Sequence, residues 1–217
     1  MGKIFAYDSP LIQSINKIVD CVFLSLLWLL FSIPVITLGA STSALYYTVN
    51  KVIHHNRSHV FREFWSSFKS SFKQSTIVWL ILLVLIYVLG IDCIYVYRLS
   101  VAGKTSMWII APFVATAVVA TMWAFYVFAY IARFHNNLKS IMKNSLFFVI
   151  RHLLRSVLVV AVFAAATALT LFLPIVVVIV PTLSMFLISI ILESIFKKYM
   201  SEEDLEAEEE KNQAYYY

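Results

Sequence analysis

The chain has 217 residues, of which 61% are hydrophobic and only 13% are charged, with a formal net charge of +5. Soluble domains carry about 25% charged residues, so this composition excludes an ordinary soluble protein. It predicts a single integral membrane domain, residues 1–200, followed by an acidic cytoplasmic tail, residues 201–217. The basic residues lie beside apolar segments, where anionic headgroups account for them, so we expect membrane lipids and no nucleic acid as partners.

The first apolar segment, residues 18–53, is longer than the roughly 20 residues that a helix needs to cross a bilayer. It is interrupted at Pro34 and Gly39, which allows either one kinked, overlong helix or two antiparallel helices that turn at this pair. We favour the helical hairpin and assign Pro34 and Gly39 to the geometry of its turn.

Small side chains follow the turn. They form a stripe that lets a neighbouring helix approach closely in lipid, and they are Gly39, Ala40, Ser41, Ser43 and Ala44. The neighbouring helix belongs either to this chain or to a partner protein. We favour the internal contact and keep Gly39, Ala40 and Ala44 as candidate partner-binding residues.

Aromatic residues recur every three or four positions in the next segment, residues 61–76. They are Phe61, Phe64, Trp65, Phe68 and Phe72. This spacing, with Lys and Ser between the aromatics, predicts an amphipathic cytoplasmic helix that either lies among lipid headgroups or docks on a protein. We favour lipid contact and retain the five aromatics as candidate partner-binding residues.

Further apolar segments cover residues 77–97, 107–132 and 156–196, and the last is long enough for two spans interrupted by Pro174 and Pro181. Together with the first hairpin they predict six transmembrane helices. Five crossings remain an alternative if residues 40–53 lie along the membrane interface. We therefore expect an all-α, polytopic membrane bundle.

The loops suggest the orientation of this bundle. Residues 51–73 and 133–155 each hold five Lys or Arg residues, which favours the cytoplasmic side for both loops. The second loop shows helical spacing of apolar residues and predicts another amphipathic cytoplasmic helix. With six crossings, the N-terminus and the C-terminus both lie in the cytoplasm. Seven of the twelve acids lie between Glu202 and Glu210, in the tail.

Ionisable residues inside apolar segments are the first place to look for a transport function. Asp92 is the candidate, although we favour a role at the outer interface, with Arg98 or Lys104 as its partner. Glu193 is expected to pair with Lys197, one helical turn later. Neither residue lies at a clear midplane.

Motifs of known enzymes are missing from the sequence. His55 and His59 lack a His-Glu-x-x-His frame, and neither cysteine has a partner at zinc-ligand spacing. The chain has four glycines, no phosphate-binding loop and no Gly-x-Ser-x-Gly elbow. We expect no enzymatic activity, no catalytic residues, no metal and no cofactor.

The run over residues 26–47, with Trp28, Pro34, Thr37 and Gly39 as its structural motif, resembles the signature of the YesL-like family of small bacterial membrane proteins of unknown function. The resemblance continues over residues 61–79 and 133–152. Ser25 and Ser71 depart from it, because many members have asparagine at these positions.

The resemblance implies a link to carbohydrate use, because such proteins are often encoded beside sugar-binding proteins and ABC permeases of Gram-positive bacteria. It predicts an accessory or regulatory subunit in the bacterial cell membrane that binds the permeases of a carbohydrate ABC importer. The alternatives are a small-solute transporter that works alone and a membrane sensor or scaffold whose acidic tail binds a cytoplasmic protein.

Overall fold

A computed structural model describes residues 10–54, 59–103, 106–134, 136–200, 202 and 205–206, and all regular structure within them is helical. The longer helices are α1 (Pro10–Ser32), α2 (Leu38–Thr48), α3 (Val60–Val101), α4 (Ala111–Arg133), α5 (Leu138–Arg151), α6 (Leu153–Phe172) and α7 (Val180–Phe196). Short 3₁₀ or π-helical turns adjoin α2, α4 and α7. The prediction of an all-α fold is therefore confirmed. Most of the acidic tail lies outside the described residues.

Four helical segments in the described part of the chain are long and apolar enough to cross a membrane. They are Val60–Val101, Met107–Arg133, Leu153–Phe172 and Val180–Tyr199. The prediction of a membrane protein is supported, but the predicted count of six crossings is not confirmed. The difference lies in the first hairpin, where α2 (11 residues) and the π-helical turn that continues it from Val49 to His54 (6 residues) together remain shorter than the roughly 20 residues that span a bilayer.

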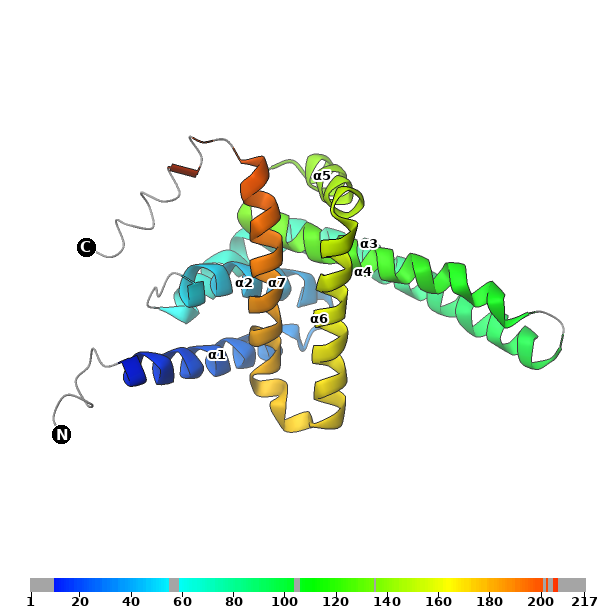
Figure 1. Cartoon of the computed structure of the whole chain (residues 1–217), viewed down its shortest axis with the longest axis horizontal. Helices are drawn as coiled ribbons and strands as arrows, with labels where there is room; N and C mark the ends of the chain where they lie inside the picture. Colours follow the sequence, from blue (N-terminus) through cyan, green and yellow to red (C-terminus); the bar gives the residue numbers. More distant parts are fainter. Residues whose placement is uncertain are drawn as a thin grey trace.

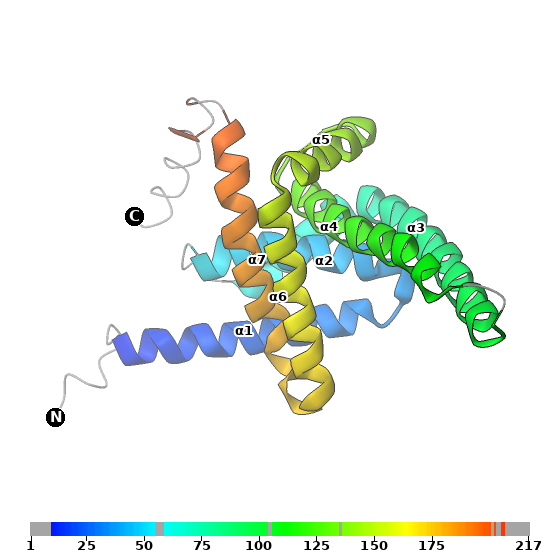
Figure 2. The same ribbon diagram turned by 45° about the vertical axis from the view of Figure 1, so that its right-hand side comes forward.

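The helices form three hairpins of different direction (Figure 1). Helices α1 and α2 run back and forth beside each other, and α3 and α4 form a long arm that leaves the body of the molecule. The α6–α7 hairpin crosses α1 and α2 steeply in both views (Figure 2). Since transmembrane helices tilt on average by only about 20°, at least one of these hairpins is strongly inclined to the membrane normal.

The turn between α1 and α2 is fixed by hydrogen bonds. Pro34 follows the end of α1, where a residue without an N–H group cannot continue the helix. The Thr37 hydroxyl donates to the carbonyl oxygens of Phe31 and Pro34 at 2.6 and 2.7 Å. Trp79 of α3 donates its indole N–H to the carbonyl oxygen of Val35 at 2.6 Å. The predicted hairpin is thus present, and α3 holds its turn.

Helix α3 corrects one prediction. The aromatic segment and the apolar segment after it were expected to be a cytoplasmic loop helix and a separate span, but they form one continuous helix of 42 residues, about 63 Å long at 1.5 Å per residue. The sequence between residues 60 and 89 contains neither glycine nor proline, so nothing local breaks the helix. The second predicted loop helix is present as α5, with Ile141, Ser145, Phe148 and Val149 buried.

Gly39 sits where α2 packs closely on α3. A Cβ atom at this position would lie 2.7 Å from both the backbone oxygen of Ser75 and the Cβ of Trp79, and 3.1 Å from the ring of Phe128. Contacts below 3.0 Å with backbone cannot be relieved by a change of rotamer. Glycine is therefore required by the close approach of the two helices.

We predict that Gly39→Ala destabilises the protein by about 1–3 kcal/mol, the usual cost of inserting an atom into a well-packed contact. The measurement is thermal unfolding of the purified protein in detergent. Gly90→Ala is the matched control, because a Cβ at Gly90 meets no atom within 4 Å and alanine is the better residue in a helix interior. Equal midpoints for the two variants would contradict the close approach.

Candidate functional site

The aromatic segment of α3 has two faces. Phe64 and Phe68 are buried, and their rings lie 5.6 and 5.1 Å from the ring of Phe31 in α1. Phe61 and Phe72 are exposed, with 51% and 39% of their surfaces accessible. Three of the five candidate docking residues therefore contact α1 within the chain, because Trp65 also lies against Phe31, at 5.4 Å. Only Phe61 and Phe72 are left facing outward.

The small-residue stripe packs within the chain, as the favoured interpretation expected. Gly39, Ala40 and Ala44 are all buried in α2. The hydroxyls of Ser43 and Ser75 form a hydrogen bond of 2.8 Å from α2 to α3. This face is occupied by α3, so it is not a free surface for a partner helix.

The remaining motif residues join α1 to α2. Trp28 donates its indole N–H to the Thr42 hydroxyl at 3.4 Å, and Ser32 and Ser41 are hydrogen-bonded at 2.8 Å. Side-chain hydrogen bonds of this kind link helices in the low-water environment of a membrane. The motif of the resemblance is therefore explained by packing of the first hairpin.

Asp92 lies in the projecting half of α3 and is half-buried. It forms no ion pair with any residue in the described part of the chain. Arg98, one of the two partners expected for it, also has no ion pair there, and Lys104 lies outside the described residues. Among the described residues, Asp92 is therefore not paired with a second ionisable group.

A buried polar cluster instead connects three parts of the fold. Glu193 of α7 is 8% exposed and forms a salt bridge with Arg133, the last residue of α4. The Tyr46 hydroxyl and the Asn50 amide donate to the Oε1 atom of Glu193 at 2.8 and 2.6 Å. We call Tyr46, Asn50, Arg133 and Glu193 the Glu193 cluster.

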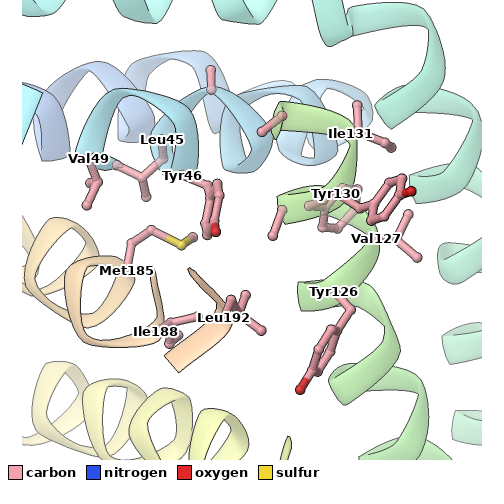
Figure 3. Close-up of a cluster of buried hydrophobic side chains, with 14 of the residues drawn as sticks. Leu45, Tyr46, Val49, Tyr126, Val127, Tyr130, Ile131, Met185, Ile188 and Leu192 are labelled. Carbon is pink, nitrogen blue, oxygen red and sulfur yellow. The ribbon is translucent and has the colours of Figure 1, made fainter. Parts of the chain in front are cut away.

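The Glu193 cluster lies beside the apolar core between α2, α4 and α7. Figure 3 shows Tyr46 near Leu192 of α7 and Tyr130 of α4, at the place where these helices converge. Arg133 also donates to the sulfur of Met200 at 3.2 Å and lies 5.7 Å from the ring centre of Phe134. The carboxylate is thus compensated by a cation and two neutral donors, which is what an ionised group requires away from water.

The ion pair expected between Glu193 and Lys197 is replaced by this longer-range pair. The α-helix ends at Phe196, and Lys197 begins a short 3₁₀ turn in which its side chain is exposed. The sequence indicates that Glu193 needs an opposite charge, because it lies in an apolar helix, but it does not indicate which cation provides it. Arg133 is one of the five cations of the predicted cytoplasmic loop, residues 133–155, and nothing near it in the sequence marks it as the partner of Glu193.

The Glu193 cluster joins the ends of α2, α4 and α7. Its carboxylate accepts hydrogen bonds from Tyr46 and Asn50 and pairs with Arg133. Across the described residues, no group of three His, Cys, Asp or Glu side chains could hold a metal ion. His55 of the histidine pair lies outside the described residues.

Residues 21–93 match a family model described as "Protein of unknown function, DUF624". The match is consistent with the resemblance to the YesL-like family, and it covers most of α1, all of α2 and most of α3. No curated protein and no solved structure matches the chain. The matched segment therefore runs from the middle of α1 through the turn and α2 into the second half of α3.

Ser25 and Ser71, the two departures from the family pattern, lie in this segment, and each side chain forms a hydrogen bond. Ser25 is hydrogen-bonded to the Thr182 hydroxyl at 2.7 Å and accepts from the Thr182 backbone N–H at 3.2 Å. Ser71 donates to the carbonyl oxygen of Ser67 at 2.7 Å. Ser25 thus joins α1 to α7, whereas Ser71 bonds only within α3.

We predict that Arg133→Gln destabilises the protein by about 3–5 kcal/mol, because it leaves a buried carboxylate without its cation. The double variant Arg133→Gln/Glu193→Gln should recover part of this loss, since the amide carbonyl introduced at position 193 can still accept from Tyr46 and Asn50. The unfolding free energies of both single variants and of the double variant, each relative to the unchanged protein, give the coupling free energy between the two side chains.

Arg155→Gln is the control for this comparison, because Arg155 contacts Ser194 at an exposed position. Its effect should stay within about 0.5 kcal/mol. Additive effects of the Arg133 and Glu193 substitutions would show that the two side chains are not energetically coupled.

Proposed function

We propose that this protein is an accessory or regulatory subunit of the bacterial cell membrane that binds the permeases of a carbohydrate ABC importer. The proposal is supported by the α3–α4 arm, which leaves the body of the protein with an unpaired apolar surface (Figure 1). An arm of two helices offers a side surface to the helices of a neighbour.

One face of the arm has the spacing of a helix-packing seam. Its exposed residues on α3 recur every three or four positions, as residues at a helix–helix contact do. They are Val84, Tyr87, Val88, Ile91, Ile94 and Tyr95. Tyr87 and Tyr95 are 70% and 64% exposed, and aromatic side chains are frequent anchors of protein interfaces. We place the permease contact on this seam, which we call the Tyr87 seam.

The use of charge in the described residues favours a binding subunit over a transporter that works alone. The buried ionic pair, Arg133–Glu193, belongs to the Glu193 cluster, and Asp92 forms no ion pair with any described residue. Secondary transporters place substrate and coupling ions near the midplane, between broken helices with exposed ends. Two alternatives remain: a transporter that works alone and a sensor that acts through the acidic tail. The following experiment distinguishes both from the binding subunit.

We predict that the tagged chain, purified from its native membrane in mild detergent, brings down two ABC permeases and their ATPase in stoichiometric amounts. Tyr87→Ala/Tyr95→Ala should remove the permeases, because it truncates the two largest side chains of the Tyr87 seam. Mass spectrometry of the purified complex provides the measurement.

Leu171→Ala/Phe172→Ala is the matched control, since these residues are at least as exposed but lie at the far end of α6. Recovery of the chain alone would contradict the proposal. Transport by liposomes that hold only this chain, abolished by Asp92→Asn, would then favour the transporter. Loss of a partner on deletion of residues 201–217 would favour the sensor.

We also propose that both termini lie in the cytoplasm. The basic residues of α5 and of the first part of α3 favour this side for both segments. The number of crossings is then even, four or six, depending on whether the α1–α2 hairpin crosses the bilayer fully or enters and leaves on the same side.

Cysteine labelling tests the orientation. In a chain with Cys21→Ala and Cys93→Ala, Ser106→Cys should react with a membrane-impermeant maleimide in intact cells, because the α3–α4 connection faces outward. Ser140→Cys in α5 should react only after the cells are opened. Both positions are exposed, so the reverse pattern of reaction would overturn the orientation.

A further inference from the structure

The α5–α6 junction meets the C-terminal end of α7 at the same end of the molecule (Figure 1). His152, between α5 and α6, is hydrogen-bonded through Nε2 to the Tyr199 hydroxyl at 3.0 Å. The Tyr199 ring also lies 5.1 Å from the ring of Phe148 in α5. Arg155 of α6 donates to the Ser194 hydroxyl of α7 at 3.1 Å. Three elements are thus held together by side-chain contacts.

Positive charge gathers at this junction, and no carboxylate of the described residues forms an ion pair with it. Arg151, Arg155 and Lys198 are exposed, and none of them has an ion-pair partner among the described residues. All three cations act on the titration of His152. Burial lowers the pKa of His152 below its usual value, and the charges of Arg155, Lys198 and Arg151 lower it further.

Exposed apolar side chains adjoin the three cations. They form a continuous series across the end of α5 and the start of α6, namely Phe147, Ile150, Leu153 and Leu154. Leu154 is 84% exposed although it directly precedes Arg155. Both α6 and α7 are long and apolar enough to cross a membrane, so the junction lies where such spans end, at the level of the headgroups.

We propose that the cations Arg151, Arg155 and Lys198 bind the phosphate headgroup of an anionic phospholipid whose acyl chains cover the adjoining apolar side chains of α5 and α6. A ligand with an anionic head and an apolar body satisfies both halves of this surface. Guanidinium groups suit the head because they donate two parallel hydrogen bonds to phosphate oxygens. This inference concerns a lipid site and is independent of the proposed permease contact.

The acidic tail of the same chain is the competing occupant, because it begins immediately after Met200 and carries seven acids. Its aliphatic side chains near the acids are only Leu205 and Ala207, and its three tyrosines, residues 215–217, carry hydroxyl groups, so it offers no aliphatic series to cover Leu153 and Leu154. The apolar half of the surface therefore favours the phospholipid over the tail.

The experiment is native mass spectrometry of the delipidated full chain in detergent, titrated with phosphatidylglycerol or with phosphatidylcholine of the same acyl chains. The expected result is stronger retention of phosphatidylglycerol. Arg151→Gln/Arg155→Gln/Lys198→Gln should weaken phosphatidylglycerol binding about tenfold or more, because each cation near an anionic headgroup contributes roughly fivefold in affinity. Binding of phosphatidylcholine should not change.

Lys17→Gln/Arg98→Gln/Lys139→Gln is the control of equal charge, since these exposed cations lie on three different helices, α1, α3 and α5. Arg151→Lys/Arg155→Lys keeps the charge but loses the paired guanidinium donors, so it should lose less affinity than the triple-Gln variant. Equal losses in the two triple-Gln variants, or displacement of phosphatidylglycerol by millimolar inorganic phosphate, would overturn the lipid site. Binding that appears only after deletion of residues 201–217 would assign the cations to the tail and overturn it as well.

Discussion

The Arg133–Glu193 salt bridge is the constraint on which the packing of this protein depends. A carboxylate in an apolar body is stable only with a cation and further donors around it. To satisfy Glu193, the C-terminal ends of α4 and α7 must meet at one level, with the end of α2 close enough for Tyr46 and Asn50 to donate. The direction of α7 across the other helices follows from this meeting point.

Helix α2 connects the Glu193 cluster to the rest of the fold. In lipid the hydrophobic effect does not drive helices together, so packing of small residues and interhelical hydrogen bonds take its place. Both occur on α2: Gly39 permits contact with the backbone of α3, and the hydroxyls of Ser41 and Ser43 bond to α1 and α3. A helix of only 11 residues can therefore be the best-enclosed element of a membrane protein.

The sequence allowed the helical hairpin and its turn to be predicted, because Pro34 and Gly39 act through local geometry. It did not indicate that α3 is one continuous helix. The composition changes from aromatic and basic to apolar within α3, and such a change reflects a change in the surroundings of the helix without marking its end. Spacing placed Phe61 and Phe64 in one aromatic series, but only contact with Phe31 shows which of them is buried. The Arg133–Glu193 pair joins residues far apart in the chain, and local pattern cannot select such a partner.

The surfaces that remain differ in kind from the interior. The Arg133–Glu193 pair and the hydroxyls of the first hairpin already make contacts within the chain, so they stabilise the fold. The Tyr87 seam and the cationic α5–α6–α7 junction have no equivalent internal partner among the described residues. The family match covers most of the first hairpin and most of α3 and ends at Cys93, so it includes most of the Tyr87 seam and excludes the junction. A permease contact on the seam would therefore lie mostly within the segment that the family model describes, with Ile94 and Tyr95 beyond its end, whereas the lipid contact rests on residues of this chain outside that segment.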